Sequence, residues 1–155
     1  MFKRVLVPVD GSEHSKKALT HAIGLAKEFE GEITLVHVYS GAMPLITPAM
    51  DTLTPPPLPS PTMATVATKL REDAQKMGGE ILAEAELTVK EHRISAKMVL
   101  REGDAVREIV AVAESEKVDL IVMGHRGMSK LKEILLGSVS EGVVRKAPYP
   151  VLIVK

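Results

Sequence analysis

The chain has 155 residues, of which 45% are hydrophobic and 26% charged, a composition typical of one globular domain with a buried core. Lys and Arg together number 20, as do Asp and Glu, and only 3% of residues are aromatic, so neither a basic nucleic-acid surface nor a platform for stacking bases is expected. The lack of cysteine excludes disulfides, cysteine-ligated zinc, iron–sulfur clusters and a thiol nucleophile. The first apolar run is too short for a signal peptide, and no segment approaches the ~18 apolar residues of a membrane span. We therefore expect a cytoplasmic protein that binds neither nucleic acid nor membranes.

The first forty residues alternate short apolar runs with a helical period. Val5–Val9 is rich in β-branched residues and predicts a strand that ends at the turn sequence Asp-Gly-Ser. Ser12 can cap the following helix, in which apolar residues recur at spacings of three and four until Gly31. Ile33–Tyr39 predicts a second strand, apolar enough for burial on both faces, as in a parallel sheet.

The composition then changes. Seven of the ten prolines lie between Gly41 and Met63. Because proline lacks a backbone donor and fixes φ, this stretch predicts a long loop at about residues 41–63 rather than a helix or a central strand. The forty residues before it are too few to fold alone, so we expect residues 1–155 to form a single domain interrupted by this loop.

The second half again alternates strands and helices. The expected elements are a helix from about Val66 to Glu91, a strand near the sheet edge at Ile94–Leu100, a helix after Gly103-Asp104, a strand at Val118–Met123, a helix at Ser138–Arg145 and a last strand at Val151–Val154. Strict alternation predicts an α/β fold, with a mostly parallel sheet and helices on both faces. Ligands of such sheets bind beyond the carboxyl ends of the strands, where the strand order reverses.

One motif at such a strand end carries chemistry. Gly124-His125-Arg126-Gly127 is followed nine residues later by Gly137-Ser138, giving the pattern G-x2-G-x9-G-S. Glycine lets backbone N–H groups approach an oxyanion, and Ser138 with Glu141 predicts a capping box at the start of a helix, where phosphate is favoured. The glycines could instead serve only as turns. Their spacing, together with Asp10 on the neighbouring rim, favours phosphate binding.

Other phosphate-binding patterns are absent. There is no G-x-x-x-x-G-K-[ST] sequence, and Pro8-Val9-Asp10-Gly11-Ser12 follows the first strand where a dinucleotide fold has G-x-G-x-x-G. Asp10 has two open roles at this point. It can accept hydrogen bonds from ribose hydroxyls or an adenine amine, or it can cap the next turn together with Ser12.

These motifs resemble the universal stress protein family, and in particular its ATP-binding branch. The likeness rests on V-x-V-D-G-S at residues 7–12, L-V-H-V at 35–38, V-D-L-I-V-M-G at 118–124, G-S-V-S-E at 137–141 and P-V-L-I-V at 150–154. It implies a single-domain, open five-stranded parallel sheet of order 3-2-1-4-5, and a homodimer paired through the edge strand Val151–Val154.

The resemblance also implies the ligand and its contacts. The ligand would be ATP, or ADP or AMP, with Mg²⁺ held by the phosphates and Asp10 or Ser138 as candidate protein ligands. The adenine and ribose would contact Pro8, Asp10, Val38 and Met123. The ribose and phosphates would be bordered by Gly124, Arg126 and Gly127, and the phosphate chain would be held by Gly137, Ser138, Val139 and Ser140.

The implied function is a nucleotide-dependent signalling or protective module of the stress response. Hydrolysis requires a positioned base and a cation clamp, and the sequence identifies neither. A slow ATP hydrolase or an adenylyl-transfer enzyme using the same pocket remains an alternative, as does an interaction protein that uses the proline-rich loop and the sheet edge. None of the five histidines shows metal-ligand spacing, and His125 is expected to be the only one near the site.

Overall fold

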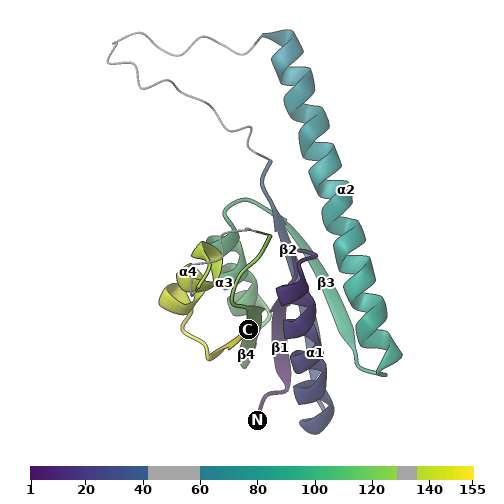
Figure 1. Ribbon diagram of the computed structural model, residues 1–155, viewed down its shortest axis with the longest axis vertical. Coiled ribbons are helices and arrows are strands. Elements are labelled where there is room, and N and C mark those ends of the chain that lie inside the picture. The colour runs from purple at the N-terminus through teal and green to yellow at the C-terminus, as the bar shows by residue number, and fades with distance from the viewer. Residues whose placement is uncertain (42–59, 129–135) are drawn as a thin grey trace.

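Five parallel strands form one sheet in the order β3-β2-β1-β4-β5 (Figure 1). The computed structural model describes residues 1–41, 60–128 and 136–155. The elements in chain order are β1 (Arg4–Pro8), α1 (Glu13–Glu28), β2 (Glu32–Tyr39), α2 (Pro61–Glu91), β3 (Ala96–Glu102), α3 (Ala105–Ser115), β4 (Leu120–Gly124), α4 (Ser138–Lys146) and β5 (Val151–Val154). The predicted fold class and strand order are confirmed, as is the edge position of β3.

Helices cover both faces of the sheet. They are needed on both because successive side chains of β1 point to opposite faces and those of Val5, Leu6 and Val7 are all apolar. Val5 and Val7 point to the face that α1 and α2 cover, and Leu6 points to the opposite face, beneath α3 and α4 (Figure 1). All three side chains are completely buried. Truncating a side chain of this kind to alanine typically costs about 2–5 kcal/mol. The two cores together hold the carboxyl ends of the strands in fixed positions.

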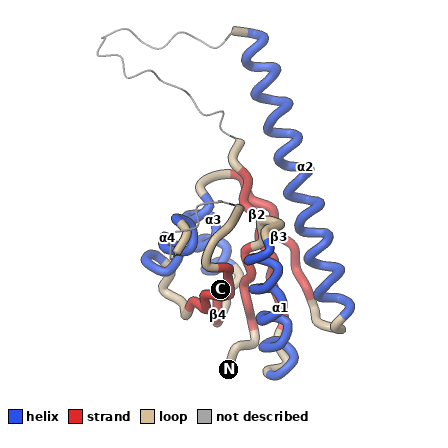
Figure 2. Tube along the Cα trace, viewed as in Figure 1, coloured by secondary structure: helices blue, strands red, loops and turns tan. Residues whose placement is uncertain are grey.

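The helix α2 begins five residues earlier than the sequence pattern predicts. Ser60 caps it, accepting a hydrogen bond from the backbone N–H of Met63 at 3.3 Å, and Pro61 occupies the first helical position. Proline is well tolerated there because the first N–H groups of a helix have no intrahelical partner. The N-terminal half of α2 extends beyond the sheet (Figure 2). Residues 42–59 of the expected proline-rich loop lie outside the described residues.

No helix within the described ranges has the length and apolar character that a membrane crossing demands.

Strand boundaries differ from the predicted ones by one to two residues, which is normal where strands continue into turns. The last strand, Val151–Val154, begins and ends where predicted.

The pair Gly78-Gly79 shows how closely α2 approaches the sheet. A Cβ atom at Gly78 would lie 2.6 Å from Cδ2 of His37 and 2.8 Å from Cδ1 of Leu100, whereas a Cβ atom at Gly79 would meet nothing within 4 Å. Gly78 is buried and Gly79 is exposed. The first glycine therefore sets the distance between helix and sheet, and the second has no packing role.

The two glycines form a matched pair for mutation. Gly79→Ala should raise the free energy of unfolding by up to about 1 kcal/mol, since alanine is the better helix former. Gly78→Ala should lower it by about 1–3 kcal/mol because the added methyl group overpacks the interface. Urea unfolding of both variants measures the difference. Equal stabilisation by both would contradict the packing described here.

Candidate functional site

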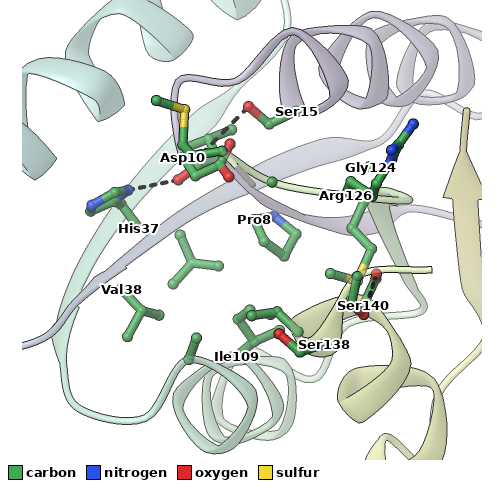
Figure 3. A pocket seen from close by; sticks show the side chains of 18 residues that line it. Pro8, Asp10, Ser15, His37, Val38, Ile109, Gly124, Arg126, Ser138 and Ser140 are labelled. Carbon is green, nitrogen blue, oxygen red and sulfur yellow. Dashed lines mark hydrogen bonds between the residues drawn. The ribbon is translucent and has the colours of Figure 1, made fainter. Parts of the chain in front are cut away.

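A cavity of about 580 Å³ opens at the carboxyl ends of β1, β2 and β4 (Figure 3). The strand order reverses at β1, because the chain passes from β1 outward through β2 and β3 and then returns to β4 on the other side. Open α/β sheets bind ligands at this switch point. The volume lies within the usual range for small-molecule sites, ~300–1,000 Å³.

All eleven residues that the sequence predicts for the site line this one cavity. They are Pro8, Asp10, Val38, Met123, Gly124, Arg126, Gly127, Gly137, Ser138, Val139 and Ser140. Seven further residues that the sequence analysis did not identify complete the lining, namely Val9, Ser15, Val36, His37, Ala105, Ile109 and Met128. The spacing of four between Ala105 and Ile109 was a usable signal, since it places both on one face of the helix that follows β3.

The Asp10 carboxylate has a structural role and also faces the cavity. Its Oδ1 accepts a hydrogen bond from the backbone N–H of Ser12 at 3.0 Å, and Ser12 in turn caps α1 by accepting from the N–H of Ser15 at 3.2 Å. Its Oδ2 lies so close to Gly127 that it would clash with a Cβ atom at that position. Oδ1 thus stabilises the turn before α1, while Oδ2 lies against the glycine turn that follows β4.

The start of α4 differs from the expected capping box. Gly137, not Ser138, is the N-cap residue, and within the described part of the chain no side chain caps the helix. Ser138 is the first helical residue and is exposed. The prediction of Ser138 as the cap was wrong because glycine also adopts the extended N-cap conformation. Without a side-chain acceptor, the first N–H groups of α4 stay available to an anion at the cavity wall, where the helix dipole favours negative charge.

The carbonyl of His125 joins the two halves of the glycine motif. It accepts hydrogen bonds from the backbone N–H of Gly137 at 2.7 Å and from Oγ of Ser140 at 2.8 Å. The Ser140 hydroxyl also lies 2.9 Å from the Gly137 carbonyl, and its side chain is buried. Ser140 therefore positions the turn with its hydroxyl, and only its backbone N–H belongs to the start of α4.

Three histidines, rather than one, lie at or beside the site. His37 lines the cavity, and its Nδ1 lies 2.7 Å from the carbonyl oxygen of Val9 (Figure 3). The rings of His14 and His125 meet edge to face with centroids 4.3 Å apart. The expectation that His125 alone would be near the site was wrong, because the sheet brings together residues far apart in the sequence.

Burial lowers the pKa of His14 below its usual value, as do the nearby charges of His125, Arg126 and Lys17, while Asp10 opposes them. Among the described residues, His14 Nδ1 is the buried side-chain nitrogen or oxygen for which no hydrogen-bond partner is found. The neutral form of this ring is thus favoured in the folded protein.

The lining divides into two chemically different parts. Side chains of Val36, Val38, Ile109 and Met123 form an apolar wall, whereas the glycine turn, Asp10 and the start of α4 present polar groups. A flat apolar group fits the first part and an anion fits the second. No group of three or more His, Asp or Glu side chains suited to a metal occurs in the part of the chain that the structure describes.

Comparison with known proteins agrees with this architecture. The family model described as "Universal stress protein family" matches residues 1–155. A universal stress protein of Methanocaldococcus jannaschii is 35% identical over 155 residues, covering 100% of this chain and 83% of the relative. The universal stress protein YxiE of Bacillus subtilis is 36% identical over 155 residues and covers 100% of both chains.

Two solved structures are similar over nearly their whole length. The M. jannaschii protein MJ0577 superposes with a TM-score of 0.80 at 29% identity, covering 100% of this chain and 96% of that one. A universal stress protein solved in complex with cAMP has a TM-score of 0.67 at 27% identity, covering 99% and 97%. The match of sequence, strand order and length establishes that this chain belongs to the universal stress protein family.

Proposed function

We propose that the chain binds ATP, or the related ADP or AMP, and acts in the cytoplasm as a nucleotide-dependent signalling or protective module of the stress response. The observation that carries the proposal is the convergence of all eleven motif residues on one cavity at the strand switch point. A relative at 27% identity was solved in complex with cAMP, which supports an adenine nucleotide as the ligand class.

The two parts of the lining match the two parts of a nucleotide. An adenine ring has the size and flatness for the apolar wall of Val38, Ile109 and Met123. The ribose hydroxyls then fall near Asp10, whose Oδ2 faces the cavity side of the turn. The phosphates reach the turn at Gly124–Gly127 and the N–H groups of Ser138, Val139 and Ser140, where glycine leaves the backbone accessible.

The residues present also fit a Mg²⁺ ion that arrives with the nucleotide. Mg²⁺ is usually bound by substrate phosphates and one or two protein oxygens rather than by an all-protein cage. Asp10 supplies a carboxylate at the cavity and Ser138 a hydroxyl, and either of them would hold the ion together with the phosphates. When bound, the ion would neutralise phosphate charge. The backbone N–H groups then orient the phosphate chain.

Gly127→Val tests the placement of the nucleotide. The valine side chain would occupy the space between the glycine turn and the Asp10 carboxylate, so affinity for ATP should fall at least about tenfold, which is about 1.4 kcal/mol. Gly24→Ala is the matched control, because its Cβ atom meets nothing within 4 Å on the exposed side of α1. Calorimetry with ATP, ADP and AMP measures the nucleotide affinity of both variants, and urea unfolding checks that the two variants are equally stable.

Two results would count against the proposal. One is a wild-type protein that shows no heat of binding with any adenine nucleotide and releases none on denaturation. The other is unchanged ATP affinity in Gly127→Val, which would place the nucleotide elsewhere even if binding occurs.

We also propose that the protein forms a homodimer through β5. The backbone N–H of Ile121 donates to the carbonyl of Pro150 and that of His125 to Val154, at 2.9 and 2.8 Å. Backbone groups alternate in direction along a strand, so Val151 and Ile153 direct theirs to the open edge. Leu152 beside them is 39% exposed. An open strand edge of this kind is a template for pairing with a second chain.

Val151→Pro removes one outward N–H without touching the ladder to β4, and proline is tolerated at the first residue of an edge strand. Val151→Thr is the control because it keeps both the N–H and the shape. Sedimentation velocity should give about twice 16.7 kDa for wild type and Val151→Thr, and should shift toward 16.7 kDa for Val151→Pro. A monomeric wild type at all concentrations would disprove the dimer.

A further inference from the structure

The side chain of His37 makes a hydrogen bond where the backbone of the sheet would make one if the strands continued. The pairing of β1 with β2 runs as far as Pro8 opposite Val36, and the N–H of Val9 donates to the Val36 carbonyl at 2.9 Å. In a parallel ladder the next bond would join the N–H of Val38 to the carbonyl of Val9. The pairing stops before that bond, and Nδ1 of His37 lies 2.7 Å from the Val9 oxygen.

The ring nitrogen is the donor in this contact, because a carbonyl oxygen can only accept. Nδ1 of His37 therefore carries a proton whether the ring is neutral or charged. The Val9 oxygen belongs to the same peptide unit as the N–H of Asp10, which lies 3.5 Å from Oγ of Ser15. Figure 3 shows both contacts as dashed lines. The peptide unit that leads into Asp10 is thus held at its carbonyl by β2 and at its N–H by α1.

The ring of His37 has room for this contact because α2 presents a glycine to it. A Cβ atom at Gly78 would lie 2.6 Å from Cδ2 of His37, which is closer than real contacts allow. The half-buried side chain of His37 also lines the cavity. The ring therefore lies between α2 and the cavity, and its position depends on how α2 packs on the sheet.

The early end of the ladder leaves the backbone of Val38 facing the cavity. Two other residues of β2 show which way the backbone turns: the N–H of Ile33 donates to Ser95, and the carbonyl of Tyr39 accepts from Gly103, each at 3.0 Å. Odd-numbered residues of β2 thus turn their backbone groups toward β3. Because these directions alternate along a strand, Val38 turns its N–H and carbonyl toward β1, beyond the last residue of β1 that pairs with β2. Val38 lies in the lining of the cavity at this point.

We propose that His37 is a positioning residue for the base of the nucleotide: its ring bonds the Val9 carbonyl in place of the Val38 N–H, so that the backbone of Val38 is available to the ligand. This rests on the nucleotide binding proposed above. The N–H and carbonyl of Val38 together suit a ligand edge that carries an acceptor beside a donor. An adenine edge has this pattern, with a ring nitrogen that accepts and an amino group that donates.

His37→Phe tests this role, because phenylalanine keeps a flat ring of similar size and removes the donor. The Val9 carbonyl then lacks its side-chain partner, and we expect the Val38 N–H to bond it and to extend the ladder. ATP, ADP and AMP should each bind about fivefold more weakly, which is the usual effect of one lost hydrogen bond. The loss should be the same for all three because it occurs at the base. Calorimetry measures the three affinities.

Two further variants separate the hydrogen bond from the packing of the ring. In His37→Asn the side-chain amide can donate from nearly the position of Nδ1, so this variant should recover most of the affinity. His92→Phe is the matched control, because Nδ1 of His92 lies 2.9 Å from the Thr88 carbonyl but at the exposed end of α2. It should bind like the wild type. Wild-type affinity in His37→Phe, or equal losses in His37→Phe and His37→Asn, would overturn the proposal.

Hydrogen exchange of the Val38 amide tests the role of His37 without a nucleotide. In the wild type this amide should exchange faster than that of Val36, which lies within the ladder. In His37→Phe it should exchange more slowly than in the wild type, whereas a mere loss of stability would speed exchange. Unchanged or faster exchange in His37→Phe would refute the positioning role. Slower exchange there, in a protein whose wild type binds no adenine nucleotide, would instead show that His37 ends the ladder and that the proposed nucleotide function has failed.

Discussion

The geometry of the site depends on the two hydrogen bonds that the His125 carbonyl accepts. His125 lies directly after β4, and its carbonyl accepts from both the N–H of Gly137 and the hydroxyl of Ser140, so it ties the turn after β4 to the start of α4. Without these bonds, the N–H groups of α4 would have no fixed relation to the turn at Gly124–Gly127. An anion site made of backbone donors needs this fixed relation, because each donor contributes only when it points to the same place.

The packing of the glycines supports the same arrangement. Gly124 lies so close to the backbone of His14 that a Cβ atom would be 2.8 Å from its carbonyl carbon, and Gly127 lies against the Asp10 carboxylate. The turn after β4 is thereby pressed against the start of α1. Gly78 has the corresponding role for α2, since it lets the helix rest on His37, whose ring contacts the Val9 carbonyl at the cavity. The cavity wall is therefore in contact with α1 and α2, the two helices that cover one face of the sheet.

The cavity proposed to bind a nucleotide and the strand proposed to form the dimer are linked by one residue. His125 contacts Val154 through two of its nitrogens, and Val154 is the last residue of the edge strand proposed to form the dimer. The same ring contacts Arg126 and His14. His125 therefore connects the edge strand to the turn that lines the cavity.

Much of the fold and the site was readable from local pattern. Strand and helix periods predicted every element, and the G-x2-G-x9-G-S spacing identified the turn and the helix start that line the cavity. These features depend on properties of single residues and short segments, such as the missing Cβ of glycine and the alternation of apolar side chains. The start of α2 at Pro61 and the N-cap at Gly137 were placed wrongly, because proline and glycine each permit more than one local structure.

The sequence by itself determined the α/β class and the edge strand Val151–Val154, and its resemblance to a known family supplied the eleven residues that meet at the cavity. Tertiary structure alone decided which partners those residues have. That Ile109, His37 and Ser15 complete the lining, that Ser140 turns its hydroxyl to a carbonyl, and that His125 holds Arg126 all depend on segments far apart in the chain. Side-chain direction and hydrogen-bond partners follow from close packing across the sheet, which no local pattern encodes.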